Sequence, residues 1–265
     1  MPGDSREQSG MSGKVVAVVQ ARMASTRLPG KVLAEIAGEP MLARVVDRAR
    51  MAKTISQMVV ATTDDDEDDL IAQLCEDRGY AVYRGSQMDV LDRVYQAAGA
   101  RHAEVVVRLT GDCPLIDAGL IDQVVTAYHL AEPPVDFAAN RLPYDKTYPV
   151  GTDTEVCSFA ALERAWREAD QPHEREHVMP YLYEDTGRFR TLLVRNEQDL
   201  SHYRWTVDAP EDLEFVRQIY GHFGGRNDFT WTEVIELLEQ EPELAAVNSQ
   251  VEHKTQLDLD SGWGQ

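Results

Sequence analysis

Apolar residues along this chain follow two alternating patterns: short continuous runs, and longer segments in which they recur at every third or fourth position. The first run, KVVAVVQ at residues 14–20, is rich in β-branched side chains and is typical of a strand buried on both faces. Residues 41–51 show the second pattern, which predicts a helix with one buried face. Up to residue 109 the two patterns predict strands at 14–20, 58–62, 80–83 and 104–109, and helices at 41–51, around 70–79 and at 89–100.

This alternation of strands and helices is the signature of βαβ units, which build a largely parallel sheet through right-handed crossovers. Ligands of such sheets bind beyond the carboxyl ends of the strands. The strings QARMASTRLPGK, TTDDD and TGDCPL each follow a predicted strand. We therefore expect all three at one edge of an α/β sheet.

The pattern becomes less regular after Pro133. We predict strands at 136–139, 153–157 and 190–195, and helices at 159–169, 173–183, 211–220 and 231–240. Residues 1–13 and 248–265 lack sustained periodicity and are expected to be a flexible leader and a flexible tail. The prediction is one domain at 14–247, with a subregion at about 136–200 that faces the substrate.

Charge and composition narrow the class of protein. A net charge of −20 argues against binding to nucleic acid or to an anionic membrane, and any bound triphosphate would need a local cluster of cations with a divalent metal. No apolar run approaches the ~20 residues of a membrane-spanning helix, and residues 1–14 lack the apolar core of a signal peptide. Cys75, Cys113 and Cys157 are far apart and have no metal-ligand spacing, so we expect buried free thiols in a cytoplasmic protein.

The loop after the first strand concentrates positive charge. Arg22, Arg27 and Lys31 flank the small residues Ala24, Ser25 and Thr26, and Pro29 with Gly30 indicates a tight turn. Cations combined with a backbone that permits close approach suit a triphosphate. The alternative is a solvated basic loop, which three cations within ten residues of so acidic a chain make less favourable.

Two aspartates follow strand-like segments. Asp112 comes directly after EVVVRL, at a position suited to holding a metal, although an Asx-turn or helix cap is the alternative. Asp208 precedes Pro210, which suits the first turn of a helix, so Asp208 alone would be interpreted as an N-cap. Together the two carboxylates match a Mg²⁺ site that is completed by substrate phosphates.

These strings, taken in order, resemble the cytidylyltransferase family, which includes the synthetases of CMP-activated 3-deoxy-manno-octulosonate and acylneuraminate. The resemblance is closest to the SpsF-type branch, named for spore-coat polysaccharide biosynthesis, and it spans residues 15–216. The matching strings are VVAVVQARMASTRLPGKVLAEIAGEPML, VVATTDDDEDD, YRGSQMDVLDR, RLTGDCPLID, YPVGTDTEV, REHVMPYLY and RWTVDAPEDLEFV.

The resemblance implies a three-layer, Rossmann-like nucleotidyltransferase fold, similar to that of nucleotide-diphospho-sugar transferases. It also implies a homodimer that joins through residues 136–200. The implied activity moves CMP from CTP to a sugar acid or related acceptor and releases pyrophosphate, for surface polysaccharide or glycoconjugate synthesis. Arg22, Lys31 and Asp112 would serve catalysis, and Asp112 with Asp208 would hold Mg²⁺. The residues implied to bind the nucleotide are Ala21, Arg22, Ser25, Arg27, Lys31, Thr62, Thr63, Arg84, Gly85 and Thr110, with those from Thr62 to Gly85 near the base.

Acceptor candidates lie between residues 148 and 177. Asp153 and Glu155 alternate along a predicted strand and so point to one face, as hydroxyl recognition or simple solvation would require. Arg175 and His177 could meet an anionic acceptor, and a dimer contact or a solvated helix face is an equal explanation for them. The full set of acceptor candidates is Tyr148, Gly151, Asp153, Glu155, Arg175 and His177.

Other functions stay open at this level. The sugar-acid synthetases have glutamine where this chain has Thr110, which leaves the base undecided, so GTP or another triphosphate acting on a sugar phosphate is one alternative. A nucleotide-sugar-dependent glycosyltransferase is another, although its DxD-type string would be Asp64–Asp66, within an acid-rich turn. A nucleotide-sensing scaffold is the third, and the intact set of cations and aspartates argues against it.

Overall fold

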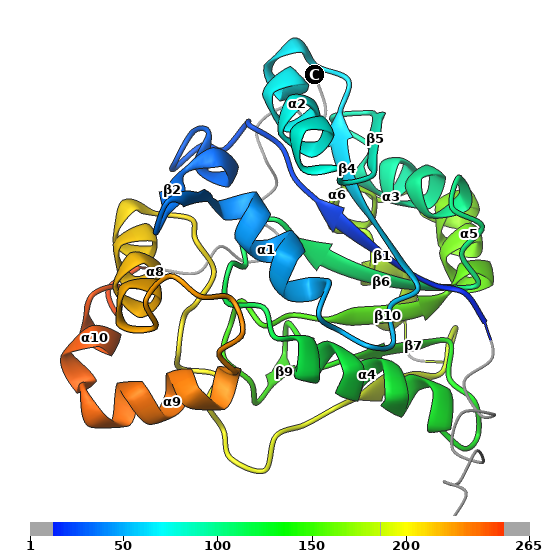
Figure 1. Ribbon diagram of the computed structural model, residues 1–265. Helices are drawn as coiled ribbons and strands as arrows, with labels where there is room; N and C mark the ends of the chain where they lie inside the picture. The colour runs from blue at the N-terminus through cyan, green and yellow to red at the C-terminus, as the bar shows by residue number, and fades with distance from the viewer. Residues whose placement is uncertain (1–12, 186, 252–265) are drawn as a thin grey trace, which may run out of the picture.

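The computed structural model describes residues 13–185 and 187–251. Its centre is a seven-stranded sheet with the strand order β11-β7-β10-β6-β1-β4-β5 (Figure 1). The strands are β1 (Val15–Gln20), β4 (Gln57–Thr63), β5 (Val82–Gly85), β6 (Val105–Thr110), β7 (Phe137–Ala139), β10 (Glu155–Ser158) and β11 (Thr191–Leu193). The predicted strand at 80–83 thus lies two residues further along the chain, and the other predicted strands are confirmed to within two residues.

The sheet is mostly parallel, as predicted. β1 pairs in parallel with β4 and β6, and β4 with β5, while β10 runs antiparallel to both of its neighbours. Because β10 is reversed, its first residue lies beside the end of β6: Glu155 pairs with Arg108. The start of β10 therefore belongs to the same edge of the sheet as the carboxyl ends of the parallel strands.

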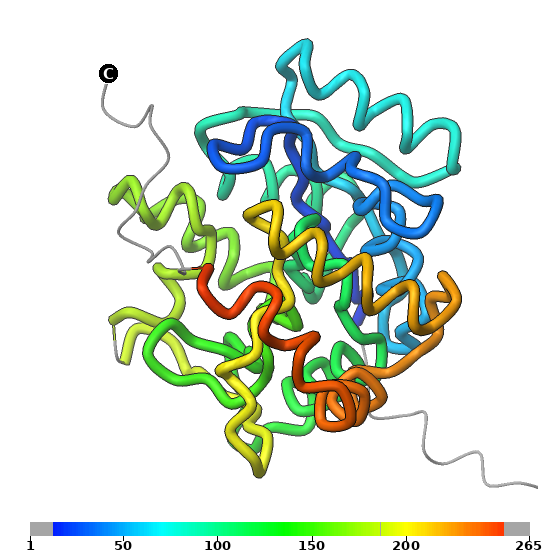
Figure 2. The backbone as a smooth tube through the Cα atoms, turned by 90° about the vertical axis from the view of Figure 1, so that its left-hand side faces the viewer, coloured from blue at the N-terminus to red at the C-terminus, as the bar shows by residue number. Residues whose placement is uncertain are grey.

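Helices cover both faces of the sheet, which gives three layers. On β1, Val15, Ala17 and Val19 pack with α1, α2, α4, α8 and α9, whereas Val16 and Val18 pack with α3 and α5. Figure 2 shows α8 to α10, in yellow to red, crossing one side of the molecule. The helices are α1 (Met41–Ala49), α2 (Asp69–Arg78), α3 (Val90–Gly99), α4 (Ala118–Leu130), α5 (Phe159–Glu168), α6 (Pro172–His177), α7 (Pro180–Tyr183), α8 (Pro210–His222), α9 (Trp231–Gln240) and α10 (Pro242–Ala246).

Two helical regions differ from the sequence prediction. The single helix expected at 173–183 is wrong: Val178 has a φ of 73° between α6 and α7. Pro180 has no N–H to donate to the carbonyl four residues earlier, so a helix through this position would lose a hydrogen bond, and the break lies just before it. Helix α4 was not predicted, although Asp117 caps it by accepting a hydrogen bond from the Leu120 N–H at 2.8 Å.

Short elements complete the chain. Hairpins form between β2 (Glu35–Ile36) and β3 (Glu39–Pro40), and between β8 (Arg141–Leu142) and β9 (Asp145–Lys146). Short 3₁₀ turns occur at Lys31–Leu33 and Asp66–Asp68. The predicted leader, apart from Gly13, and most of the predicted tail lie outside the described residues, but Asn248 is buried and packs into the domain. None of the described helices has the length and apolar character needed to cross a membrane.

Candidate active site

A cavity of about 550 Å³ opens at the carboxyl ends of β1 and β6, where Gln20 pairs with Thr110. Here the strand order reverses: from β1 the chain continues to β4 and β5 on one side and then returns to β6 on the other. Such a reversal point is where open α/β sheets bind ligands. Most of the residues predicted for the site line the cavity: Ala21, Arg22, Ser25, Arg27, Lys31, Thr110, Asp112, Asp153, Glu155, His177 and Asp208.

The basic loop after β1 owes its shape to two contacts. Gly30 adopts a left-handed conformation with φ 70°, and its N–H donates to the Met23 carbonyl at 3.0 Å, which closes the loop. Asp68 accepts the Met23 N–H at 2.7 Å from the other side. Lys31 follows directly as the first residue of a 3₁₀ turn. The loop is therefore fixed at both ends around Arg22, Ser25 and Arg27.

Lys31 joins the two predicted metal ligands. Its Nζ donates to Asp112 Oδ2 at 2.8 Å, to Asp208 Oδ1 at 2.7 Å and to the Val207 carbonyl at 2.7 Å. Burial alone would lower the pKa of Lys31, but Asp112 and Asp208 outweigh burial and raise it. The side chain is therefore a fixed positive charge between two carboxylates.

Asp208 is surrounded by cations. Arg27 Nη2 and Arg204 Nη2 lie 3.0 and 2.7 Å from its Oδ2, and Lys31 contacts Oδ1. Burial works to raise the pKa of Asp208, but Lys31, Arg27 and Arg204 bring it down to about 2. The N-cap role considered from the sequence is not observed, since α8 has Ala209 at its N-cap position.

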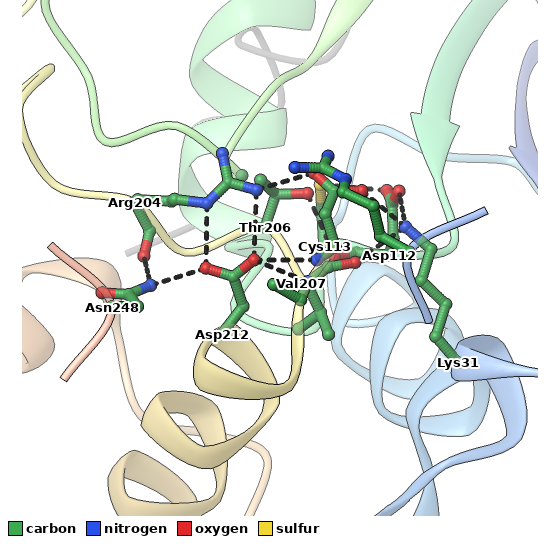
Figure 3. Close-up of polar contacts among 12 residues, drawn as sticks. Lys31, Asp112, Cys113, Arg204, Thr206, Val207, Asp212 and Asn248 are labelled. Atoms are coloured by element: carbon green, nitrogen blue, oxygen red, sulfur yellow. Dashed lines mark hydrogen bonds and ion pairs between the residues drawn. The ribbon is translucent and has the colours of Figure 1, made fainter. Parts of the chain in front are cut away.

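A second layer of polar contacts holds Asp208 in place (Figure 3). Asp212 is completely buried, and its carboxylate accepts hydrogen bonds from Arg204 and from the backbone N–H groups of Asp208 and Ala209. Asn248 donates to both the Arg204 carbonyl and Asp212 Oδ1. Neither Asp212 nor Arg204 was among the residues predicted for the site. Their roles depend on contacts between distant segments.

The backbone joins the two aspartate segments. The Val207 N–H donates to the Asp112 carbonyl at 2.8 Å, and the Trp205 N–H donates to the Val150 carbonyl at 2.7 Å. Gly151 follows Val150 with φ 102°, and a Cβ there would lie 2.4 Å from the Thr206 nitrogen. The segment around Gly151, predicted to bind the acceptor, thus packs directly behind the residues that lead to Asp208.

The donor set at this point suits a small divalent cation. A single positively charged atom, Lys31 Nζ, already contacts both carboxylates, so Asp112 and Asp208 can share one cation. No group of three or more Asp, Glu, His or Cys side chains with metal-binding geometry occurs in the described part of the chain. Two carboxylates are nevertheless sufficient for Mg²⁺ when substrate phosphates complete its coordination.

The opposite end of the cavity carries paired charges. Arg108 forms an ion pair with Glu155 and donates to Gln20 Oε1, and Arg141 Nη1 lies 3.2 Å from Asp153 Oδ1. Burial raises the pKa of Glu155, against the lowering effect of Arg108. Arg108 was not selected from the sequence, although a charge within the apolar run EVVVRL was a usable signal.

Seven predicted site residues lie outside this cavity lining. Thr62 and Thr63 are buried and donate through their hydroxyls to Asp68, which supports the basic loop. Arg175 pairs with Asp89, the N-cap residue of α3. The remaining four are Tyr148, which is buried against Trp231, Gly151, which packs against Thr206, and Arg84 and Gly85 at the end of β5.

Comparison with known proteins decides the family. The model of a family described as Cytidylyltransferase matches residues 16–251. The chain belongs to the cytidylyltransferase family. It is therefore a cytidylyltransferase by family, and the resemblance described from the sequence is confirmed.

Individual relatives agree with this assignment. The chain is 32% identical over 238 residues to the spore coat polysaccharide biosynthesis protein SpsF of Bacillus subtilis, covering 87% of this chain and 96% of that protein. It is 34% identical over 243 residues to a 3-deoxy-manno-octulosonate cytidylyltransferase of Anaeromyxobacter dehalogenans, covering 77% and 97%. A solved cytidylyltransferase structure from Leptospira borgpetersenii, 33% identical, superposes with a TM-score of 0.84 over 91% of this chain and 99% of that one. The predicted nucleotidyltransferase fold and SpsF-type branch are thus confirmed.

Proposed function

We propose that this cytidylyltransferase moves CMP from CTP to a sugar acid, releases pyrophosphate and uses Mg²⁺, in the synthesis of a surface polysaccharide or glycoconjugate. The observation that carries the proposal is the position of Lys31 Nζ, which donates to both Asp112 and Asp208 at the edge where β1 and β6 end. The sugar-acid substrate in the name of the Anaeromyxobacter relative supports the acceptor class.

The chain's own residues supply binding and charge neutralisation. Arg22, Arg27 and Lys31 stand around one end of the cavity, where their charges would stabilise the triphosphate. An acceptor oxygen attacks the α-phosphorus in line, and pyrophosphate leaves from the opposite side. Holding both substrates in one cavity removes much of the entropic barrier, so the reaction requires no nucleophilic side chain.

Asp112 and Asp208 would hold the Mg²⁺, which would neutralise phosphate charge and polarise the phosphorus–oxygen bonds. The surrounding contacts keep Asp208 ionised for this purpose, because Arg27 and Arg204 pair with its other oxygen. Cys113, next to Asp112, stays a neutral thiol because burial raises its pKa well above the ordinary value. It therefore adds no further negative charge to the metal site.

The acceptor would lie toward β10. Asp153 and Glu155 face the cavity there, each paired with an arginine, and His177 lies on the same lining. Alternating carboxylates and guanidinium groups suit a molecule that carries several hydroxyls and one negative charge, because they offer acceptors and donors side by side. This is the composition of a sugar acid.

The test is a matrix of reactions in which pyrophosphate release is followed with Mg²⁺, each of the four nucleoside triphosphates, and a panel of sugar acids and sugar phosphates. The proposal expects release with CTP and a sugar acid. Release with GTP and a sugar phosphate would contradict the proposal and favour a nucleotidyltransferase that acts on sugar phosphates. No release in any well, together with tight binding of a nucleotide sugar, would favour a glycosyltransferase.

The family resemblance adds two further parts to the proposal: a homodimer formed through residues 136–200, and a cytoplasmic location. Light scattering on the purified protein tests the first. A monomeric mass at micromolar concentration would contradict it.

A further inference from the structure

Arg93, on α3, is a buried cation with incomplete hydrogen bonding. Its side chain is 2% exposed, yet it forms part of the cavity wall beside Val90. One guanidinium nitrogen, Nη1, donates to the Ser86 carbonyl at 2.5 Å. Its Nε is buried and has no hydrogen-bond partner among the described residues. No carboxylate of the described chain forms an ion pair with it.

This arrangement is costly unless a ligand completes it. A buried donor without a partner loses its hydration for no return. Burial lowers the pKa of Arg93 to about 10, and repulsion by Arg22 adds to the lowering, whereas Asp68, Asp64 and Asp89 act in the opposite direction. A hydrogen-bond acceptor on a ligand in the cavity would satisfy the unpaired Nε of Arg93.

Arg84 presents the opposite situation. The sequence resemblance assigned it to the nucleotide base, but its three guanidinium nitrogens are all occupied. Nε donates to the Thr63 carbonyl at 2.9 Å, Nη2 to the Asp65 carbonyl at 2.8 Å, and Nη1 to Asp69 at 2.5 Å. Arg84 does not line the cavity. It joins the end of β5 to the turn after β4, and each of its three nitrogens already donates to the protein.

The order of elements along the sheet edge indicates what Arg93 would meet. The residues proposed for the triphosphate and the metal lie at the ends of β1 and β6, and those proposed for the acceptor lie at β10. The side of the cavity toward β4 and β5 therefore remains for the nucleotide base. There α3 packs over β1, β4 and β5, and Gly85 lies against the stem of Arg93. Val90 and Ala21 offer apolar surface for a flat ring.

We infer that Arg93, and not Arg84, binds the pyrimidine base of the nucleotide, by donating to the acceptor atoms O2 and N3 of the ring. This assignment rests on the proposed function, since it takes CTP as the nucleotide. The guanidinium group suits the role because it presents its donors in one plane, as a ring edge presents its acceptors.

The experiment measures three ligands by calorimetry: CTP, CMP and inorganic tripolyphosphate, which has phosphates but no base. In Arg93→Met, the affinity for CTP and CMP is expected to fall by the same factor, about 10- to 100-fold, as for a lost hydrogen bond to a charged group. Tripolyphosphate affinity should not change. Arg84→Met is the matched control, and its affinity for CMP should stay within about threefold of the wild type.

Arg93→Lys keeps the positive charge without the planar pair of donors, and it carries the test if Arg93→Met does not fold; it should lose CTP and CMP affinity and keep tripolyphosphate affinity. A loss of tripolyphosphate affinity in either Arg93 variant would overturn the assignment to the base, because Arg93 would then bind phosphate. Unchanged CMP affinity in a folded variant would overturn it in favour of a purely structural role. A wild-type chain that binds no CTP would overturn the proposed function itself, and that result is visible before any variant is made.

Discussion

The two sides of the central sheet build the site in different ways. On the parallel side, β1 and β6 end at the same edge, so the loops that follow them bring Lys31 and Asp112 to 2.8 Å from one another. On the other side, β10 runs in reverse and brings residues at its start, Glu155 and the nearby Asp153, to that edge. Parallel strands therefore bring site residues to this edge in the loops that follow them, whereas an antiparallel strand brings the residues at its beginning.

The comparison predicts that a change on the parallel side damages the chemistry for every acceptor. Lys31→Met removes the charge shared by Asp112 and Asp208, and the rate of CMP transfer should fall by about 10³-fold. Pyrophosphate release with any accepted sugar acid measures this effect. Lys53→Met, at an exposed lysine away from the cavity, is the control and should keep its rate. A Lys31→Met rate within tenfold of the wild type would show that Lys31 takes no part in the reaction.

The contact between the two sides is tested at Gly151. A Cβ at this residue would overlap the Thr206 backbone, and φ 102° disfavours any other residue, so Gly151→Ala should lower the free energy of unfolding by about 3 kcal/mol. Denaturant unfolding measures the loss. Gly38→Ala is the matched control, because Gly38 also has a positive φ but a Cβ there would meet nothing within 4 Å. Equal effects in the two variants would mean that the packing behind Thr206 is loose.

Acid should weaken the cluster at Asp208. Its pKa is about 2 in the folded protein and lies below the ordinary value of 3.8, so its contribution to stability is present above about pH 4 and is lost as the pH falls toward 2. The loss should be on the order of 2 kcal/mol. The raised pKa of Lys31 acts at the opposite end: its contribution is complete below pH 10.5 and is lost only as the pH rises beyond its folded pKa.

Urea unfolding at several pH values between 5 and 2 measures this acid effect as the difference between the wild type and Asp208→Asn. The stability of the wild type should fall more steeply with decreasing pH than that of the variant. Parallel curves for the two proteins would show that Asp208 is not held ionised by its neighbours.

The smallest effect is expected on the antiparallel side. Asp153→Asn weakens the contact with Arg141, and the KM for the sugar acid should rise about tenfold while the KM for CTP stays the same. Arg175→Met is the comparison, since Arg175 pairs with Asp89 outside the cavity lining, and its KM values should not change. A rise in the KM for CTP in Asp153→Asn would contradict the proposed position of the acceptor, because Asp153 would then contact the nucleotide.

Sequence patterns predicted the parallel side well, because hydrophobic runs define buried strands and the carboxyl ends of those strands converge by a geometric rule. Lys31 and Asp112 could be found in this way. The strand-like segment expected before Asp208 is wrong, because the described residues there form only an isolated bridge between Val150 and Arg204. The patterns failed where a role depends on contacts between distant segments. Arg175 and Arg93 are both arginines on helices, and only the fold shows that the first is paired with Asp89 and that the second, largely unpaired, lines the cavity.

The same limit applies to helix boundaries. The predicted helix at 173–183 breaks at Val178 and Pro180, which the position of a proline could have indicated, whereas α4 was missed despite its capping residue Asp117. Asp212 was not predicted to belong to the site. Its burial against Arg204 and Asn248 follows from packing that no local pattern contains.

The central claim is that Asp112 and Asp208 hold a metal against the nucleotide's phosphates, and calorimetry of CTP binding with and without Mg²⁺ tests it most directly. The wild type should bind CTP at least about tenfold more tightly with Mg²⁺, and Asp112→Asn should lose this gain while keeping the metal-free affinity. If Asp112→Asn retained the full gain from Mg²⁺, the metal would lie elsewhere and the account of the site would be contradicted.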